Sequence, residues 1–336
     1  MIMNFTILQK KQFIAALIVC GAVFVVILVL CCFASFFSEA KKQFKLGDDY
    51  VKQKKYAEAA KCYRKAAELG HKDAQLILGD FYHTGLGVEM DHKQEIYWYQ
   101  QSAKQGNQVA QFILGDRYHM GHGVEKDFNQ AAAWFRKAAE QGYAKAQNYL
   151  GECYAKGYGV ERDLQQAVYW RRKAADQGNK DAQYNLGVCY DRGDGVKQDL
   201  QQAVYWWKKA AEQGDAGAQY NLGVCYAKGQ GVKTDLKQTI YWWKKAGEQG
   251  HQDAQSNLGE LYSNGIGTEK DNYQAAYWWH KAAVQGVARA QFNLGMCYLG
   301  GKGVKADTNQ AAVWIIKAAR QGDEKALNVL KALGVY

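Results

Sequence analysis

Asparagine residues recur at a fixed interval of 36 residues in the second half of the chain. The series is Asn185, Asn221, Asn257 and Asn293, and three of its members directly follow an aromatic residue: Tyr184, Tyr220 and Phe292. A carboxamide offers N–H donors and an acceptor oxygen, which suits hydrogen bonding to a peptide backbone. Aromatic side chains are enriched in protein contact surfaces. These seven residues form the predicted peptide-binding site. The alternative is that the amides bond neighbouring helices or face solvent and that the aromatic rings pack in the core.

Two pairs of aspartate and histidine have a spacing that suits metal ligands. Asp80 and His83, like Asp116 and His119, lie three residues apart, so both side chains of a pair can face together on a helix. Later copies of the pattern lack the pair. The simpler interpretation is that these are polar surface residues, so no metal site and no cofactor is predicted.

Cysteine and glycine patterns indicate no catalytic centre. Four cysteines hold the same position in different copies of the repeat described below: Cys153, Cys189, Cys225 and Cys297. Equivalent positions in stacked helix pairs are expected to exceed the ~7 Å between Cα atoms that a disulfide allows. We therefore predict buried free thiols, which favour a reducing compartment. Every Gly-x-Gly belongs to a repeated turn, and no catalytic residue is predicted.

Composition narrows the class of partner. The 336 residues include 43 Lys and Arg, 33 Asp and Glu, and no proline, for a formal net charge of +10. This charge permits an acidic partner surface or an anionic membrane. The sequence lacks the aromatic ribonucleoprotein motif, zinc-finger spacing and a basic recognition helix, so nucleic acid is not an expected partner. The absence of proline favours helices joined by glycine-based turns.

A repeat of 36 residues organises most of the chain, and its Leu-Gly pair occurs seven times, beginning at residues 78, 114, 150, 186, 222, 258 and 294. In the fourth copy we predict one helix over 181–192 and a glycine turn. A second helix follows, with Asp199 and Gln202 as a capping box and Gly214 in the left-handed conformation at its end. Because one 36-residue unit buries too little apolar surface to fold alone, the copies are expected to stack into a solenoid.

A glycine in the middle of the first helix needs a packing explanation. Gly187 should cost ~1 kcal/mol relative to alanine, and it has a counterpart in all seven copies. We therefore predict that the missing side chain lets the two helices of a repeat approach closely. The additional tryptophans of three copies, Trp207, Trp243 and Trp279, are expected to contact the next repeat or the rim.

These residues resemble a known family. The pattern A-x-x-x-L-G-x-x-Y-x-x-G-x-G-V-x-x-D-x-x-x-A-x-x-W-x-x-K-A-A-x-x-G closely resembles the Sel-1-like repeat, a relative of the tetratricopeptide repeat, and covers residues 73–324 in seven copies. Residues 38–72 are predicted as a tetratricopeptide-like capping repeat and residues 325–336 as a C-terminal capping helix. The expected fold is all-α, a right-handed α-solenoid of stacked two-helix repeats.

The resemblance implies a non-enzymatic adaptor or scaffold. In tetratricopeptide superhelices the first helices line a concave groove, so the asparagine series would bind an extended segment of a protein or peptide partner there. A cysteine-rich branch of the family has β-lactamase activity, but it pairs two cysteines per repeat and this chain has at most one. A β-lactamase-type hydrolase and a structural envelope or cell-wall-associated protein remain as alternatives.

The segment 13–37 contains no charged residue. At ~1.5 Å per residue its 25 residues could cross a hydrocarbon core of ~30 Å, which predicts a transmembrane helix after a tail at 1–12. A cleaved signal peptide is the rival interpretation. Lysines after the segment outnumber those before it, which favours a cytoplasmic repeat domain. The expected localisation is therefore a single-pass membrane protein, with an exported or periplasmic domain left open.

Overall fold

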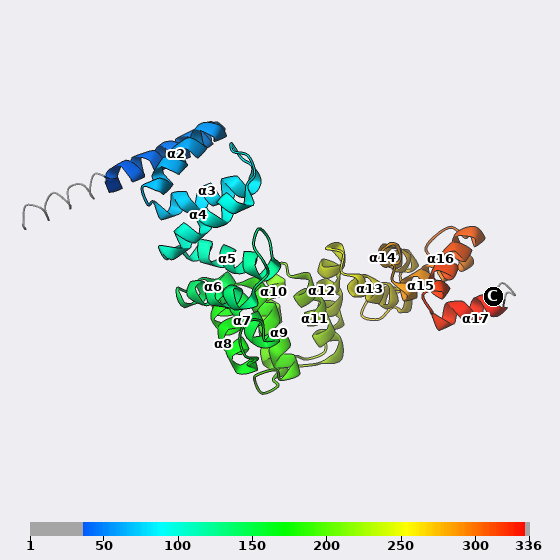
Figure 1. The fold of residues 1–336 in the computed structure, drawn as a ribbon. Coiled ribbons are helices and arrows are strands. Elements are labelled where there is room, and N and C mark those ends of the chain that lie inside the picture. The colour runs from blue at the N-terminus through cyan, green and yellow to red at the C-terminus, as the bar shows by residue number, and fades with distance from the viewer. Residues whose placement is uncertain (1–35, 333–336) are drawn as a thin grey trace, which may run out of the picture. The chain divides into compact units, whose positions relative to one another are not determined.

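The computed structural model describes residues 36–332, and every regular element within that range is an α-helix (Figure 1). A helix over 36–52 and α2 (Tyr56–Glu68) precede seven pairs of helices, and α17 (Glu324–Ala332) follows them. We call the first helix of each pair helix A and the second helix B. The helices A are α3 (Lys72–Thr84), α5 (Gln108–Met120), α7 (Ala144–Lys156), α9 (Lys180–Arg192), α11 (Ala216–Lys228), α13 (Gln252–Asn264) and α15 (Ala288–Gly300). The helices B are α4 (His92–Lys104), α6 (Phe128–Glu140), α8 (Leu164–Asp176), α10 (Leu200–Glu212), α12 (Leu236–Glu248), α14 (Asn272–Val284) and α16 (Thr308–Arg320).

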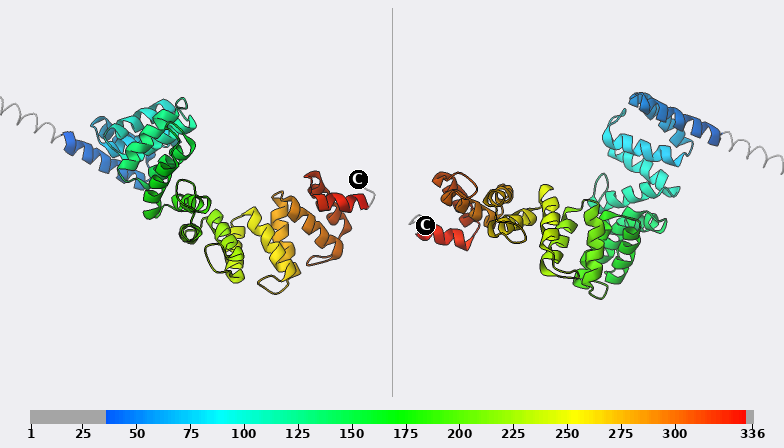
Figure 2. Two further views of the ribbon diagram at one scale, coloured as in Figure 1. Left: turned by 90° about the horizontal axis from the view of Figure 1, so that it is seen from below. Right: turned by 180° about the vertical axis from the view of Figure 1, so that it is seen from behind.

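The helices form two compact units that divide within α7. The first unit contains α2 to α6 and the start of α7, and the second contains the rest of α7 and α8 to α17. Within each unit a helix A packs on helix B of its own repeat and on helix B of the preceding repeat, as α5 does on α6 and α4, and α9 on α10 and α8 (Figure 2). The predicted all-α solenoid of stacked helix pairs is therefore confirmed.

Aspartate begins every helix B. In α10 the Asp199 carboxylate accepts hydrogen bonds from the backbone N–H groups of Gln201 and Gln202, both at 3.0 Å. The backbone N–H of Asp199 donates to the Tyr190 carbonyl of helix A at 2.9 Å. In a capping box this N–H would donate to the Gln202 side chain instead. The predicted aspartate cap is thus confirmed, but the predicted reciprocal glutamine bond is wrong, because the end of helix A already satisfies that donor.

The mid-helix glycines lie against large side chains of helix B. A Cβ atom on Gly187 would lie 2.5 Å from Trp207 Cδ1, and one on Gly223 would lie 2.3 Å from Trp243 Cδ1. Close approach of the two helices, as predicted, is the reason for the glycine. Trp207 and Trp243 are both buried against helix A of their own repeat, and Trp243 also belongs to an apolar cluster with residues of the next repeat.

A buried glutamine joins three consecutive helices, a contact that the repeat pattern did not predict. Gln183 of α9 donates to the Ala175 carbonyl of α8 at 3.1 Å and accepts from Gln213, directly after α10, at 2.7 Å. Hydrogen bonds of this kind contribute about 0.5–1.5 kcal/mol each, and leaving such buried groups unpaired costs more. The same pair of bonds is made by Gln75, Gln111, Gln219, Gln255 and Gln291.

The structure contradicts the single-pass membrane localisation expected from the sequence. Within residues 36–332 no helix is long and apolar enough to cross a membrane. A repeat helix of 13 residues is only about 20 Å long at ~1.5 Å per residue, against a hydrocarbon core of ~30 Å. Nearly all of the predicted anchor at 13–37, with the tail at 1–12, lies outside the described residues.

Candidate functional site

The predicted asparagines form a row on successive helices A of the second unit. Asn185 lies on α9, Asn221 on α11, Asn257 on α13 and Asn293 on α15. All four side chains are partly buried. We call these four residues the asparagine row.

Two members of the row are held by hydrogen bonds within the protein. The Asn185 amide donates to Asn148 Oδ1 at 3.3 Å. Asn257 Oδ1 accepts from Arg289 Nη2 at 2.7 Å, and Arg289 in turn pairs with Glu260 at 3.1 Å. These amides are therefore occupied and fixed in orientation.

The other two members have unused amides. Within the part of the chain that the structure describes, the side chains of Asn221 and Asn293 have no hydrogen-bond partner, and both remain partly accessible. Asn293 lines a cavity of about 250 Å³ whose wall also includes Trp279 and Met296. Amide groups beside apolar surface provide the donors and acceptors that an extended peptide needs.

The predicted aromatic residues join consecutive repeats. The Tyr220 ring stacks on His251 with centroids 4.4 Å apart, and Phe292 packs against the apolar cluster around Ile315. A Cβ atom on Gly217 would lie 3.1 Å from the Tyr184 ring, which places that ring beside α11. These rings thus pack between repeats, and each keeps an accessible edge.

A second exposed surface lies on helices B of the same unit. Tyr169, Tyr205, Tyr241 and Tyr277 hold one position in α8, α10, α12 and α14 and are 43–48% exposed. A lysine one turn later lies over each ring, and Lys209 Nζ is 4.7 Å from the centroid of Tyr205 and 5.2 Å from that of Trp206. We call these four residues the tyrosine row. The Tyr-x-x-x-Lys spacing was the sequence signal that would have identified it.

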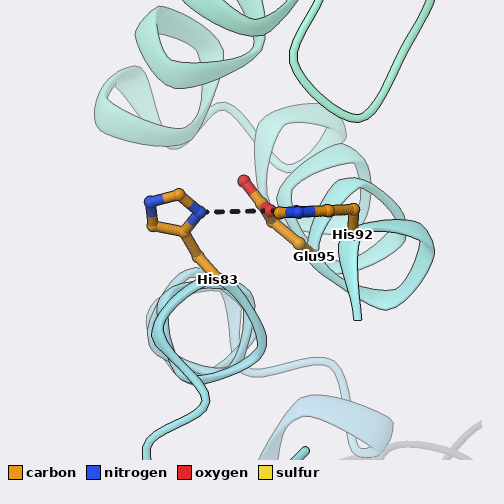
Figure 3. Close-up of side chains that lie close together, drawn as sticks. All are labelled: His83, His92 and Glu95. Carbon is orange, nitrogen blue, oxygen red and sulfur yellow. Dashed lines mark hydrogen bonds and ion pairs between the residues drawn. The ribbon is translucent and has the colours of Figure 1, made fainter. Parts of the chain in front are cut away.

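The first unit contains a charged cluster around the buried side chain of Glu95, which is only 1% exposed (Figure 3). Its Oε2 atom lies 2.8 Å from His92 Nδ1 and 3.2 Å from His83 Nδ1. Its Oε1 atom accepts from Arg117 Nε at 2.7 Å. Burial by itself would raise the pKa of Glu95, but the hydrogen bonds from His92 and Arg117 and the charge of Arg117 outweigh burial and hold that pKa below its usual value.

Neither candidate aspartate–histidine pair forms a hydrogen bond or ion pair among the described residues. His83 turns to Glu95, whereas Asp80 accepts a hydrogen bond from the Tyr99 hydroxyl at 2.6 Å. His119 packs among aromatic rings, 5.3 Å from Phe128 between centroids. Sequence reasoning therefore selected His83 but missed its partners.

A sequence signal for the cluster was present in the repeat alignment. Glu95 stands four residues after the capping aspartate, where the other copies have a small residue: Ala131, Ala167, Ala203, Thr239, Ala275 and Ala311. A carboxylate in a position that is otherwise apolar and buried requires charged or hydrogen-bonding neighbours.

The cysteines of the described residues are buried free thiols, as predicted. Burial raises the pKa of Cys153 to about 12, and that of Cys225 and Cys297 to about 11. At neutral pH these side chains are neutral thiols, which are poor nucleophiles.

Comparison with known proteins agrees with the repeat geometry. The Sel1 repeat model matches residues 43–71, 72–107, 108–143, 144–179, 180–215, 216–251, 252–287 and 288–323. The solved structure of a Sel1 repeat protein from Oxalobacter formigenes is 37% identical, with a TM-score of 0.70, and the match covers 88% of this chain and 86% of that one. The structure of c5321, described as a protective antigen of uropathogenic Escherichia coli with an SLR fold, is 34% identical with a TM-score of 0.66, covering 88% of this chain and 73% of that one. No curated protein matches the chain significantly.

Proposed function

The chain belongs to the Sel1 repeat family, a scaffold fold for protein interactions, and we propose that it binds an extended segment of a protein partner along the helices A of its second unit. The binding residues are the asparagine row with its flanking aromatic side chains Tyr184, Tyr220 and Phe292. The role is that of a non-catalytic adaptor.

The observation that carries the proposal is the pair of unused amides, Asn221 and Asn293. They hold equivalent positions two repeats apart, so they present the same chemistry at two points of a regular stack. An extended peptide has backbone donors and acceptors along its whole length, and its side chains need not match for these contacts to form.

The two bonded asparagines have a supporting part. Asn148 orients the amide of Asn185, and Arg289 orients that of Asn257. Tyr220 and Phe292 pack between repeats and so keep neighbouring helices A at a constant separation. A preorganised surface loses less conformational entropy on binding, and this favours affinity.

The buried thiols support a non-catalytic role, because burial raises the pKa of Cys153, Cys225 and Cys297 and leaves them poorly nucleophilic. Neither alternative from the sequence, a hydrolase or a structural envelope protein, draws support from a particular arrangement among residues 36–332.

The test starts from a displayed library of random 12-residue peptides selected on the full chain. The affinity of a selected peptide is then measured by fluorescence anisotropy for the wild type and for Asn221→Ala/Asn293→Ala. Loss of two neutral hydrogen bonds, at about 0.5–1.5 kcal/mol each, should weaken binding about 5- to 140-fold. Circular dichroism should show unchanged helicity, because neither amide bonds the fold.

Two matched controls locate the binding face. Asn309→Ala removes an exposed amide from helix B α16, and Tyr205→Ala/Tyr241→Ala truncates the tyrosine row. Both should bind the peptide like the wild type. Equal affinity of the double asparagine variant and the wild type would refute the proposal, and loss of binding in the tyrosine variant alone would move the site to helices B.

A further inference from the structure

The cluster around Glu95 has a ligand set that the proposed function does not use. One ligand atom from each of His83, His92 and Glu95 lies within 4.8 Å of the others (Figure 3). His92 and Glu95 come from one face of α4, three residues apart, and His83 reaches them from the last turn of α3.

We propose that His83, His92 and Glu95 bind a zinc ion, with water in the fourth position. Two histidines and one carboxylate, with an open position for water, are a recognised ligand set for zinc. The side chains of His83 and His92 are 46% and 55% exposed, so an ion can reach the site from solvent.

The distances suit a tetrahedral ion after a small movement. Metal–ligand bonds of ~2.0–2.2 Å place neighbouring ligand atoms of a tetrahedral zinc about 3.4 Å apart. The two Nδ1 atoms lie 3.2 and 2.8 Å from Glu95 Oε2. Relative to Oε2, admitting the ion requires outward movements of about 0.2 and 0.6 Å, which the exposed imidazoles can make.

The buried carboxylate is held in position by a residue outside the ligand set. Arg117 of α5 binds Oε1 at 2.7 Å, which leaves Oε2 facing both imidazoles. Hydrogen bonds to the ligands of a metal fix their orientation in this way. Arg117 Nη2 also lies 3.5 Å from His83 Nδ1, so the guanidinium borders the site.

The charges around Glu95 leave room for a further cation. Arg117 offsets the charge of Glu95 alone, although two other carboxylates lie beside it. The carboxylate of Asp116, 3.2 Å from Arg117, and that of Asp80, which interacts with His83 and Arg117, bring the surroundings to a net negative charge when the imidazoles are neutral. A second cationic group, such as a divalent ion held by both imidazoles, satisfies this balance.

The test is a zinc titration of the full chain, stripped with chelator and kept reduced with a phosphine, by isothermal calorimetry at pH 7.5. The variants are His83→Gln/His92→Gln and Glu95→Ala, with His122→Gln as a matched control because His122 is also an exposed histidine of the first unit. The wild type and His122→Gln should each bind one more equivalent of zinc, in a saturable manner, than the other two variants do. Zinc bound by cysteines is common to all four proteins and cancels.

The variants should fold, so loss of binding is interpretable. The replaced histidines are exposed, and Glu95→Ala introduces the residue that most other repeats have at this position. The affinity of the wild type for this additional zinc ion should be lower at pH 5.5, since zinc binds neutral imidazole in competition with protons. Equal stoichiometry in the wild type and His83→Gln/His92→Gln, or no saturable equivalent in the wild type, would overturn the proposal.

Discussion

The second helices of two repeats, α4 in the first unit and α10 in the second, differ in charge at one buried position. In α10 this position is Ala203, which is completely buried, and in α4 it is Glu95, which is 1% exposed. Both helices keep the same length and the same aspartate cap. The comparison teaches that the repeat can bury a charge without a change of backbone when neighbouring helices supply partners, here His83 and Arg117.

The largest expected effect comes from removing the main partner of Glu95. Arg117→Met leaves a buried carboxylate without its guanidinium, and breaking a buried pair in this way costs about 3–5 kcal/mol. The double variant Glu95→Ala/Arg117→Met should regain most of that loss, because α4 then resembles α10. Urea unfolding followed by circular dichroism measures the free energy of unfolding of both variants. A double variant as unstable as Arg117→Met would show that the charge is not the cause.

A smaller effect is expected where the two helices of a repeat touch. Gly223→Ala would place a Cβ 2.3 Å from the Trp243 ring, and overpacking of this kind costs about 1–3 kcal/mol. The matched control is Gly151→Ala, whose Cβ would lie 2.9 Å from Arg171 Cγ and 3.0 Å from the Ala167 carbonyl oxygen, both longer than the distance to the Trp243 ring. The control should therefore lose less free energy of unfolding than Gly223→Ala, since both variants gain the same ~1 kcal/mol of helix propensity. Equal unfolding free energies for the two variants would contradict this packing explanation.

The smallest effect concerns a histidine cap and depends on pH. His251 Nδ1 accepts from the Ala254 N–H at 3.4 Å at the start of α13, a position that Asn179 holds before α9. Burial lowers the pKa of His251 below its usual 6.5, against the opposing charges of Asp253 and Asp215. As the pH falls, the unfolded chain therefore becomes protonated at this histidine before the folded protein does. The stability that the neutral histidine contributes is fully present above pH 6.5 and is lost as the pH drops toward the lower pKa of the folded protein.

His251→Asn keeps the cap and removes the titration. Its free energy of unfolding should change less between pH 7.5 and pH 5.0 than that of the wild type, by up to about 1 kcal/mol, the usual contribution of such a cap. Other groups titrate in both proteins, so the difference between the two pH profiles reports His251. Identical profiles would show that this histidine does not sense the pH.

Most of the fold could be predicted because its signals are local. The predicted helix over 181–192 is observed as Lys180–Arg192, and the aspartate cap and the left-handed Gly214 are where they were expected. Helix ends depend on the caps and on glycine, which act within one turn of the chain. Membership of the Sel1 repeat family followed from the same residues.

The candidate sites could be predicted only in part. The sequence supplied the asparagine row as a set. It could not show that Arg289, 32 residues further along the chain, hydrogen-bonds to Asn257, whereas Asn221 has no partner among residues 36–332. It likewise supplied His83 and not Arg117, which is 34 residues further along the chain. Single-pass membrane localisation was inferred from hydrophobicity alone and is contradicted.

By itself, the sequence determined the period of the repeat, the ends of its helices and the residue types offered at each position, because these follow from local backbone preferences and from the spacing of apolar side chains. Only the tertiary structure decided which polar groups meet. Gln183 bonds both a carbonyl of α8 and Gln213, and Glu95 collects His83, His92 and Arg117, because stacking brings helices of neighbouring repeats into contact. Those contacts depend on how whole helices pack, which no single repeat contains.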